Sequence, residues 1–166
     1  MLTSHELFGF MPHALSTQIL EDTFAQDKEL YRLTVNAVAE ARKLRPVFFE
    51  RKPRAERNND LIAMLAKPRL DLIAGNVLRG WLMRKNKPML TDFLNALGIA
   101  HKDGVVDELP ATVEEGKLRA AVENLLNTFP PEEVSVYLNA FYAMNEISWP
   151  NLKHLLENEP RLQFGG

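Results

Sequence analysis

The chain has 166 residues, a length that fits one domain with a core of its own, and 46% of the residues are hydrophobic. It contains no cysteine, which excludes disulfides, thiolate metal ligands and a cysteine nucleophile. The N-terminus lacks the basic residues of a secretory signal, and the longest clear apolar run, 61–66, is far shorter than the about 20 residues that span a bilayer. We therefore expect a cytoplasmic protein without a membrane segment.

Helical periodicity covers most of the first 45 residues. A capping box over Thr3–Glu6 predicts a short first helix, and Pro12 begins a second one. Asp27 is expected to cap a third helix, in which apolar residues recur every three or four positions. Pro46 disfavours helical geometry at the residue before it, so it is expected to end this third helix.

The segment 46–58 shows no sustained period and predicts a connector. Its three consecutive apolar residues, Val47, Phe48 and Phe49, are expected to anchor the connector in the core. Asn59 then caps a short helix in this interpretation.

The next helix, begun by Pro68, covers 69–84 and is apolar on most of its circumference. A helix of this kind is normally surrounded by others, so the pattern predicts a buried central helix. Gly75 and Gly80 are expected at points of close helix approach, because each costs about 1 kcal/mol against alanine inside a helix.

Proline and capping residues divide the rest of the chain into further helices. Pro88 opens one, Thr112–Glu115 resembles a second capping box, Pro131 begins another helix, and Ser148 can cap the last. No strand of useful length competes with this pattern. The prediction is an all-α fold of about eight to ten helices in a single compact domain. This domain covers 1–160, and 161–166 form a flexible C-terminal tail.

Charge is distributed unevenly along the chain. Residues 42–87 include thirteen basic and four acidic residues, whereas both flanking segments are net acidic and the whole chain has a net charge of −2. We call the densest part the basic block, and it consists of Arg42, Lys43, Arg45, Arg51, Lys52, Arg54 and Arg57.

Three interpretations of the basic block stay open. The acidic flanks can fold beside it and form surface ion pairs worth about 0–1 kcal/mol each. Alternatively, the block can contact the phosphates of a nucleic acid. A third interpretation is recognition of an acidic protein partner, where charge sets the encounter rate and the register. The acidic pI of about 6.1 and the lack of a nucleic-acid module favour the first interpretation over the second.

Catalytic and metal-binding motifs are missing from the sequence. The four histidines show no metal-ligand spacing, and the glycine-rich phosphate loops and the nucleophile elbow are absent. Neighbouring carboxylates diverge by about 100° on a helix, so they do not suggest an acid–base pair. We therefore predict no catalytic residue, no metal site and no cofactor.

The segment 97–110 gathers a histidine, two aspartates and a glutamate near a glycine turn. It lacks the carboxylates that anchor both ends of a calcium-binding EF-hand loop. Gly98 instead predicts a left-handed helix C-cap, and Asp103-Gly104 predicts a turn. His101 and Asp107 are the two residues of this segment that we consider for a functional role.

Trp149 and Tyr142 would mark a partner-binding patch if they were exposed. The function favoured by the sequence is a non-enzymatic protein–protein interaction module, or a module that self-associates. One alternative is nucleic-acid binding through 42–57. The other is a small-molecule binder or enzyme whose site is built between helices from distant residues.

Overall fold

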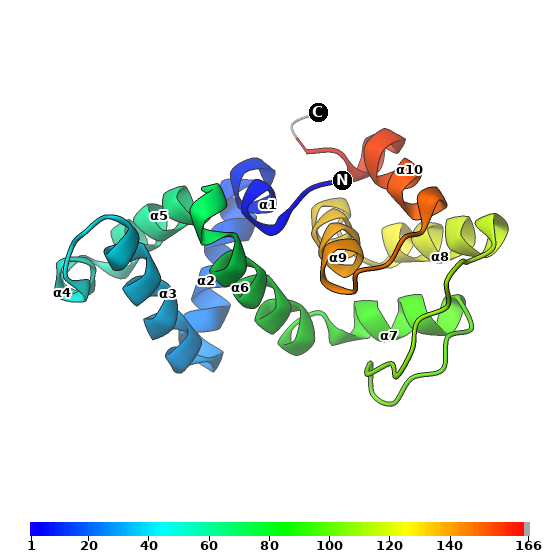
Figure 1. The fold of residues 1–166 in the computed structure, drawn as a ribbon, viewed down its shortest axis with the longest axis horizontal. Coiled ribbons are helices and arrows are strands. Elements are labelled where there is room, and N and C mark those ends of the chain that lie inside the picture. Colours follow the sequence, from blue (N-terminus) through cyan, green and yellow to red (C-terminus); the bar gives the residue numbers. More distant parts are fainter. Residues whose placement is uncertain (165–166) are drawn as a thin grey trace. The chain divides into compact units, whose positions relative to one another are not determined.

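The computed structural model describes residues 1–164. Within this range the chain forms ten α-helices and two short 3-10 helices, and no strand (Figure 1). This confirms the prediction of an all-α fold with eight to ten helices. The chain divides into two compact units: an N-terminal unit, Leu2–Trp81, and a C-terminal unit that begins at Leu82 and includes Met1. The extent of the predicted single domain, 1–160, stays a prediction.

The N-terminal unit contains the first five helices and most of the sixth. They are α1 (Ser4–Phe10), α2 (His13–Gln26), α3 (Lys28–Ala41), α4 (Pro46–Glu50), α5 (Arg54–Leu65), the 3-10 helix η1 (Pro68–Leu70) and α6 (Asp71–Arg84). The predicted caps are present at two of these helices. Thr3 and Glu6 form the capping box of α1, and the Asp27 carboxylate accepts a hydrogen bond of 3.1 Å from the backbone N–H of Leu30.

The end of α3 differs from the prediction. The helix ends at Ala41, and Lys43 follows with a φ of 56°, in the left-handed region. The backbone N–H of Leu44 then donates to the carbonyl of Ala39 at 2.8 Å, which is the closing bond of a Schellman motif. Pro46 therefore does not end α3. It occupies the first turn of α4, where a missing N–H costs nothing.

The predicted connector at 46–58 is wrong, because α4 and the start of α5 lie in it. The expectation that all three apolar residues reach the core is also wrong. Phe49 is fully buried, but Val47 is 40% exposed and Phe48 is 44% exposed. Consecutive helical side chains point about 100° apart, so a five-residue helix can direct only one of the three inward.

Helix α6 is buried along one face only, so the prediction of a central helix surrounded by others is wrong. Ala74, Val77, Leu78 and Trp81 have no exposed surface. On the opposite side Leu72 is 81% exposed. A Cβ added to Gly75 would lie 3.2 Å from the hydroxyl oxygen of Ser4, which confirms a close approach of α1 at this glycine. The same expectation for Gly80 stays a prediction.

The C-terminal unit is built from the remaining helices. They are α7 (Lys87–Ala96), α8 (Glu115–Thr128), α9 (Pro131–Met144), α10 (Pro150–Asn158) and the 3-10 helix η2 (Pro160–Leu162). Aromatic rings form the centre of its core: Phe141 lies 5.3 Å from Phe93 and 5.7 Å from Trp149, measured between ring centroids. Phe93 and Trp149 are fully buried, so these edge and tilted contacts fix how α7, α9 and the start of α10 pack.

Two predicted helix caps in this unit are wrong. Glu114, not Thr112, is the N-cap of α8, because its carboxylate accepts from the backbone N–H groups of Gly116 and Lys117 at 3.0 and 3.2 Å. Likewise Trp149 precedes α10 in place of Ser148.

The last described residues are packed against the C-terminal unit. Leu162 is 2% exposed, and its carbonyl accepts a hydrogen bond of 2.6 Å from the hydroxyl of Ser135. Arg161 forms a two-pronged ion pair with Glu123, at 2.9 and 2.8 Å. The flexible tail predicted for 161–166 stays a prediction, and residues 165–166 lie outside the described residues.

Candidate functional site

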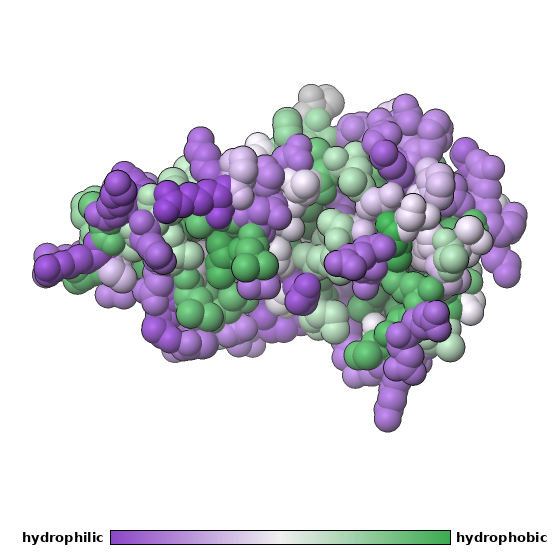
Figure 2. All heavy atoms as spheres, viewed as in Figure 1, coloured by the Kyte–Doolittle hydropathy of each residue, from purple (hydrophilic) through white to green (hydrophobic). Residues whose placement is uncertain are grey.

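The basic block begins directly after α3, has residues on both sides of α4 and continues into the first turn of α5. Helices α3 and α4 pack against each other, so the block forms one continuous region of the N-terminal unit (Figure 1). Figure 2 shows hydrophilic spheres projecting around α4, with apolar ones between them. The seven cations of the block fall into two groups that differ in their partners.

Three of the cations, Lys52, Arg54 and Arg57, are held by neighbouring side chains. The Lys52 ammonium lies 2.6 Å from the Asp60 carboxylate and 4.7 Å from the centre of the Phe48 ring. Similarly, the Arg54 guanidinium pairs with Glu21 at 2.9 Å. Acidic side chains therefore lie beside the basic block at Lys52 and at Arg54, and an aromatic ring also lies beside it at Lys52.

Arg57 belongs to a buried network that joins α2, α3 and α5. The Tyr31 hydroxyl donates to the side-chain oxygen of Asn58 at 2.6 Å and accepts from Nε of Arg57 at 3.1 Å. The amide of Asn58 in turn donates to Glu21 at 3.3 Å. Burial raises the pKa of Tyr31, although the nearby Arg57 guanidinium acts in the opposite direction. The network therefore holds a neutral phenol and fixes Arg57 in a structural role.

The other four members are exposed, and none forms an ion pair within residues 1–164. We call Arg42, Lys43, Arg45 and Arg51 the exposed cations. Arg42 has one further contact, because its guanidinium lies 5.7 Å from the centre of the Phe49 ring. Glu50 is the single acidic residue of α4, and it too is exposed without an ion pair. The covering of the block by acidic neighbours thus accounts for Lys52 and Arg54 but not for these four.

Val47 and Phe48 lie among the exposed cations and were missed by the sequence analysis. Their side chains are 40% and 44% exposed, next to each other on the short helix α4. The signal that could have identified them is the run of three large apolar residues inside a short, proline-initiated and highly charged segment. We call the six residues the basic–apolar surface, and they are Arg42, Lys43, Arg45, Val47, Phe48 and Arg51.

Lys43 adopts a backbone conformation that favours glycine. Its φ of 56° places it at the position after a helix end that glycine usually occupies. A side chain in this region costs about 1–2 kcal/mol. A cation near the C-terminus of α3 regains about 0.3–1 kcal/mol from the helix dipole. Position 43 therefore holds a lysine although the backbone alone favours glycine there. The ammonium of this lysine contributes one of the positive charges of the basic–apolar surface.

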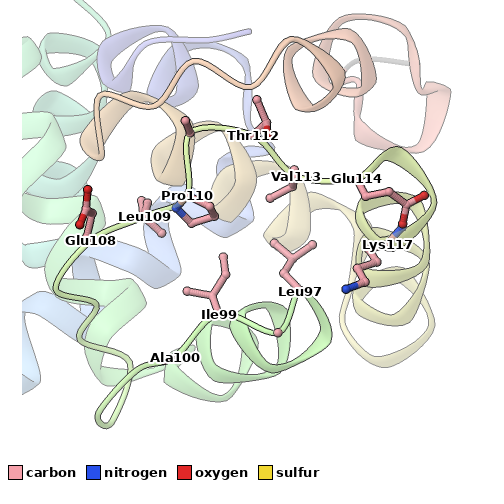
Figure 3. Close-up of a pocket in the computed structure, with 12 residues that line it drawn as sticks. Leu97, Ile99, Ala100, Glu108, Leu109, Pro110, Thr112, Val113, Glu114 and Lys117 are labelled. Carbon is pink, nitrogen blue, oxygen red and sulfur yellow. The ribbon is translucent and has the colours of Figure 1, made fainter.

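The loop between α7 and α8 encloses a separate hollow of about 510 Å³ in the C-terminal unit (Figure 3). Leu97 and Ile99 point into it from one side, and Leu109, Pro110 and Val113 from the other. The polar side chains at its rim are those of Glu108, Thr112, Glu114 and Lys117, and Glu114 is already used to cap α8. This set does not pair a nucleophile with a base.

His101 and Asp107 do not form a reactive pair in this loop. Nε2 of His101 lies 2.7 Å from the side-chain oxygen of Asn95, and its Nδ1 accepts from the backbone N–H of Gly104 at 3.1 Å. Both ring nitrogens thus stabilise the turn. Gly98 has a φ of 70°, and the N–H of Ile99 donates to the carbonyl of Leu94 at 2.9 Å, which confirms the predicted C-cap.

Trp149 is not part of an exposed patch, which corrects the conditional expectation for it. Its side chain has no exposed surface, and its Nε1 donates to the carbonyl of Pro110 at 2.9 Å. Tyr142 is half-buried. The tryptophan is inside because it anchors the α7–α8 loop to the aromatic core of the C-terminal unit.

Within residues 1–164, no group of three or more histidine, aspartate or glutamate side chains is close enough to hold a metal ion. In the same part of the chain, every helix is too short or too polar to cross a bilayer. The candidate functional site of this chain is the basic–apolar surface. Comparisons of the chain with models of protein families, with curated proteins and with solved structures gave no match.

Proposed function

We propose that this protein is a non-enzymatic interaction module that binds an acidic segment of a partner protein through the basic–apolar surface. The observation that supports this proposal is a group of four exposed cations that form no ion pair among the described residues and lie directly after α3 and at the two ends of α4. A charged group that has no partner in its own chain is free to pair with one supplied from outside.

Charge complementarity governs the kind of partner. Four cations on one region attract an acidic segment, speed its encounter and set its register. Each contact is solvent-exposed, so each adds a modest free energy and is weakened by salt. The proposal therefore predicts binding that is reversible and sensitive to ionic strength.

Binding of a fluorescent oligoglutamate peptide to the full chain, followed by anisotropy, tests the proposal. The test variant carries Lys43→Gln, Arg45→Gln and Arg51→Gln. A matched control carries Lys102→Gln, Lys117→Gln and Lys153→Gln. It removes the same charge from exposed lysines of the C-terminal unit that form no ion pair within 1–164. We expect the Kd to rise by about tenfold in the test variant and to stay near the wild-type value in the control.

Binding is also measured over a series of salt concentrations and with a second probe, a single-stranded oligothymidylate. Affinity for the peptide is expected to fall as the salt concentration rises through the physiological range. Equal weakening in the two triple variants, or no binding at low salt, overturns the proposal. Tighter binding of a single-stranded oligothymidylate than of the peptide at the same salt also overturns it, in favour of nucleic acid.

A further inference from the structure

We infer that the acidic segment recognised by this protein carries apolar side chains among its acids, and that these dock on Val47 and Phe48. The inference rests on the proposed function and names the class of partner more closely. It distinguishes an acidic, amphipathic peptide from a purely acidic one.

The two apolar side chains lie next to each other in the sequence of the basic–apolar surface. Val47 and Phe48 are adjacent on α4, and both keep about two-fifths of their surface exposed. Single exposed apolar residues are ordinary, but here two neighbours lie on a five-residue helix whose N-cap and C-cap are the exposed cations Arg45 and Arg51. A central apolar spot with a charged rim is the common arrangement of protein-binding sites, because apolar contacts hold the partner and the rim orients it.

The Phe48 side chain is held in place by its neighbours. The Phe48 ring lies 5.2 Å from the ring of Phe49, which is fully buried, in an edge-to-face contact. Lys52 lies over Phe48 at 4.7 Å while its ammonium pairs with Asp60 at 2.6 Å. A side chain fixed by a buried ring and a paired cation loses little freedom when a partner binds, which favours its use as an anchor.

The surroundings of Phe48 do not favour the stacking of nucleic-acid bases. A base stacks on an open aromatic face. In this protein one face of Phe48 is occupied by Lys52, and the neighbouring exposed side chain is the aliphatic Val47. A mixed aliphatic and aromatic spot suits leucine-like or phenylalanine-like side chains better than flat bases.

The test uses two short peptides with glutamates at identical positions. One peptide has leucine and phenylalanine between the glutamates, and the other has serine at those positions. We expect the wild-type chain to bind the apolar peptide about tenfold more tightly than the serine peptide. The double variant Val47→Ser/Phe48→Ser is expected to lose this preference, so that its Kd values for the two peptides become equal.

Two further variants make the outcome decisive. Leu72→Ser is the matched control, because Leu72 is 81% exposed on α6 and lies outside the basic–apolar surface, so the preference is expected to persist. Val47→Ser alone keeps the contacts of Phe48 and is expected to reduce the preference even if the double variant does not fold. Equal binding of both peptides to the wild-type chain overturns this inference alone, whereas absence of binding to either peptide overturns the proposed function.

Discussion

The Asp71 carboxylate accepts two hydrogen bonds from His5, one from its backbone N–H at 3.0 Å and one from its imidazole Nδ1 at 2.7 Å. A carboxylate can only accept, so Nδ1 carries the proton in this contact. The Thr3 hydroxyl oxygen also lies 3.2 Å from this Nδ1, but the hydroxyl donates its proton to Glu6 at 2.7 Å and therefore does not donate to the imidazole. One side chain at the start of α6 therefore fixes the start of α1, a pairing across 66 positions of the chain.

Replacing Asp71 with asparagine is expected to lower the free energy of unfolding by about 1 kcal/mol. Hydrogen bonds to a charged acceptor contribute about 1.5–3 kcal/mol, and the half-exposed carboxylate reduces that figure. Urea denaturation followed by circular dichroism measures the change. Asp107→Asn is the control, since Asp107 is exposed in a loop and its side chain has no hydrogen bond to any residue that the structure describes. Equal stability of the two variants would show that the His5 contact contributes nothing.

The same contact is expected to make the protein less stable in acid. Burial acts to raise the pKa of Asp71, but the hydrogen bonds from His5 outweigh it, so the pKa is lowered on folding. The unfolded chain then binds more protons than the native one at low pH, and the free energy of unfolding decreases as the pH falls below about 4. The side chain and backbone of Thr3 lower the pKa of Glu6 in the same direction.

Urea unfolding at a series of pH values between neutral and acid tests this dependence. The wild-type chain is expected to lose more stability over the series than Asp71→Asn, which has no carboxyl group to protonate at that position. Parallel curves for the two proteins would contradict the assignment of the acid sensitivity to Asp71.

Lys43→Gly is expected to stabilise the fold and at the same time to weaken binding of the acidic peptide. Glycine relieves the left-handed backbone at φ 56°, and the lost helix-dipole contact reduces the gain to about 0.5–1 kcal/mol. Arg45→Gly is the contrasting variant, because Arg45 has an extended φ of −76° where glycine only adds freedom to the unfolded chain. Thermal unfolding should show a higher Tm for Lys43→Gly and a lower Tm for Arg45→Gly. The affinity for the acidic peptide should fall in both variants.

How far the sequence predicts this molecule depends on whether a feature is local. The Thr3–Glu6 capping box and the Asp27 cap involve residues three apart, so the pattern identifies them directly. At the start of α8 two local solutions compete. Thr112 offers a capping hydroxyl, but Glu114 reaches two backbone N–H groups at once and sets the helix start two residues later.

The candidate site depends on contacts that no local pattern contains. The ion pair of Arg54 requires Glu21 from α2. The ion pair of Lys52, which lies just before α5, requires Asp60 from within that helix. Similarly, Trp149 is buried because the Pro110 carbonyl lies within 2.9 Å of its Nε1, across 39 positions of the chain. The sequence therefore predicts which segment is cationic, but only the fold separates the exposed cations from the structural ones.

Tyr31→Phe tests the network that gives Arg57 its structural role. Removing the hydroxyl leaves the side-chain oxygen of Asn58 without its donor, and Asn58 has no exposed surface. An unpaired buried polar atom costs about 1–3 kcal/mol, so we expect a loss of that size in the free energy of unfolding. Tyr142→Phe is the matched control, because Tyr142 is half-buried and its hydroxyl has no hydrogen bond within the described residues.

The same variant distinguishes structural from binding cations. The exposed cations do not contact Tyr31, so the folded Tyr31→Phe protein should bind the acidic peptide with the wild-type Kd. A rise in Kd that matches the loss for Lys43→Gln/Arg45→Gln/Arg51→Gln would instead place the Tyr31 network inside the binding surface. Unchanged stability would show that water satisfies Asn58 when the phenol is removed, since a buried amide oxygen otherwise bears the full desolvation penalty.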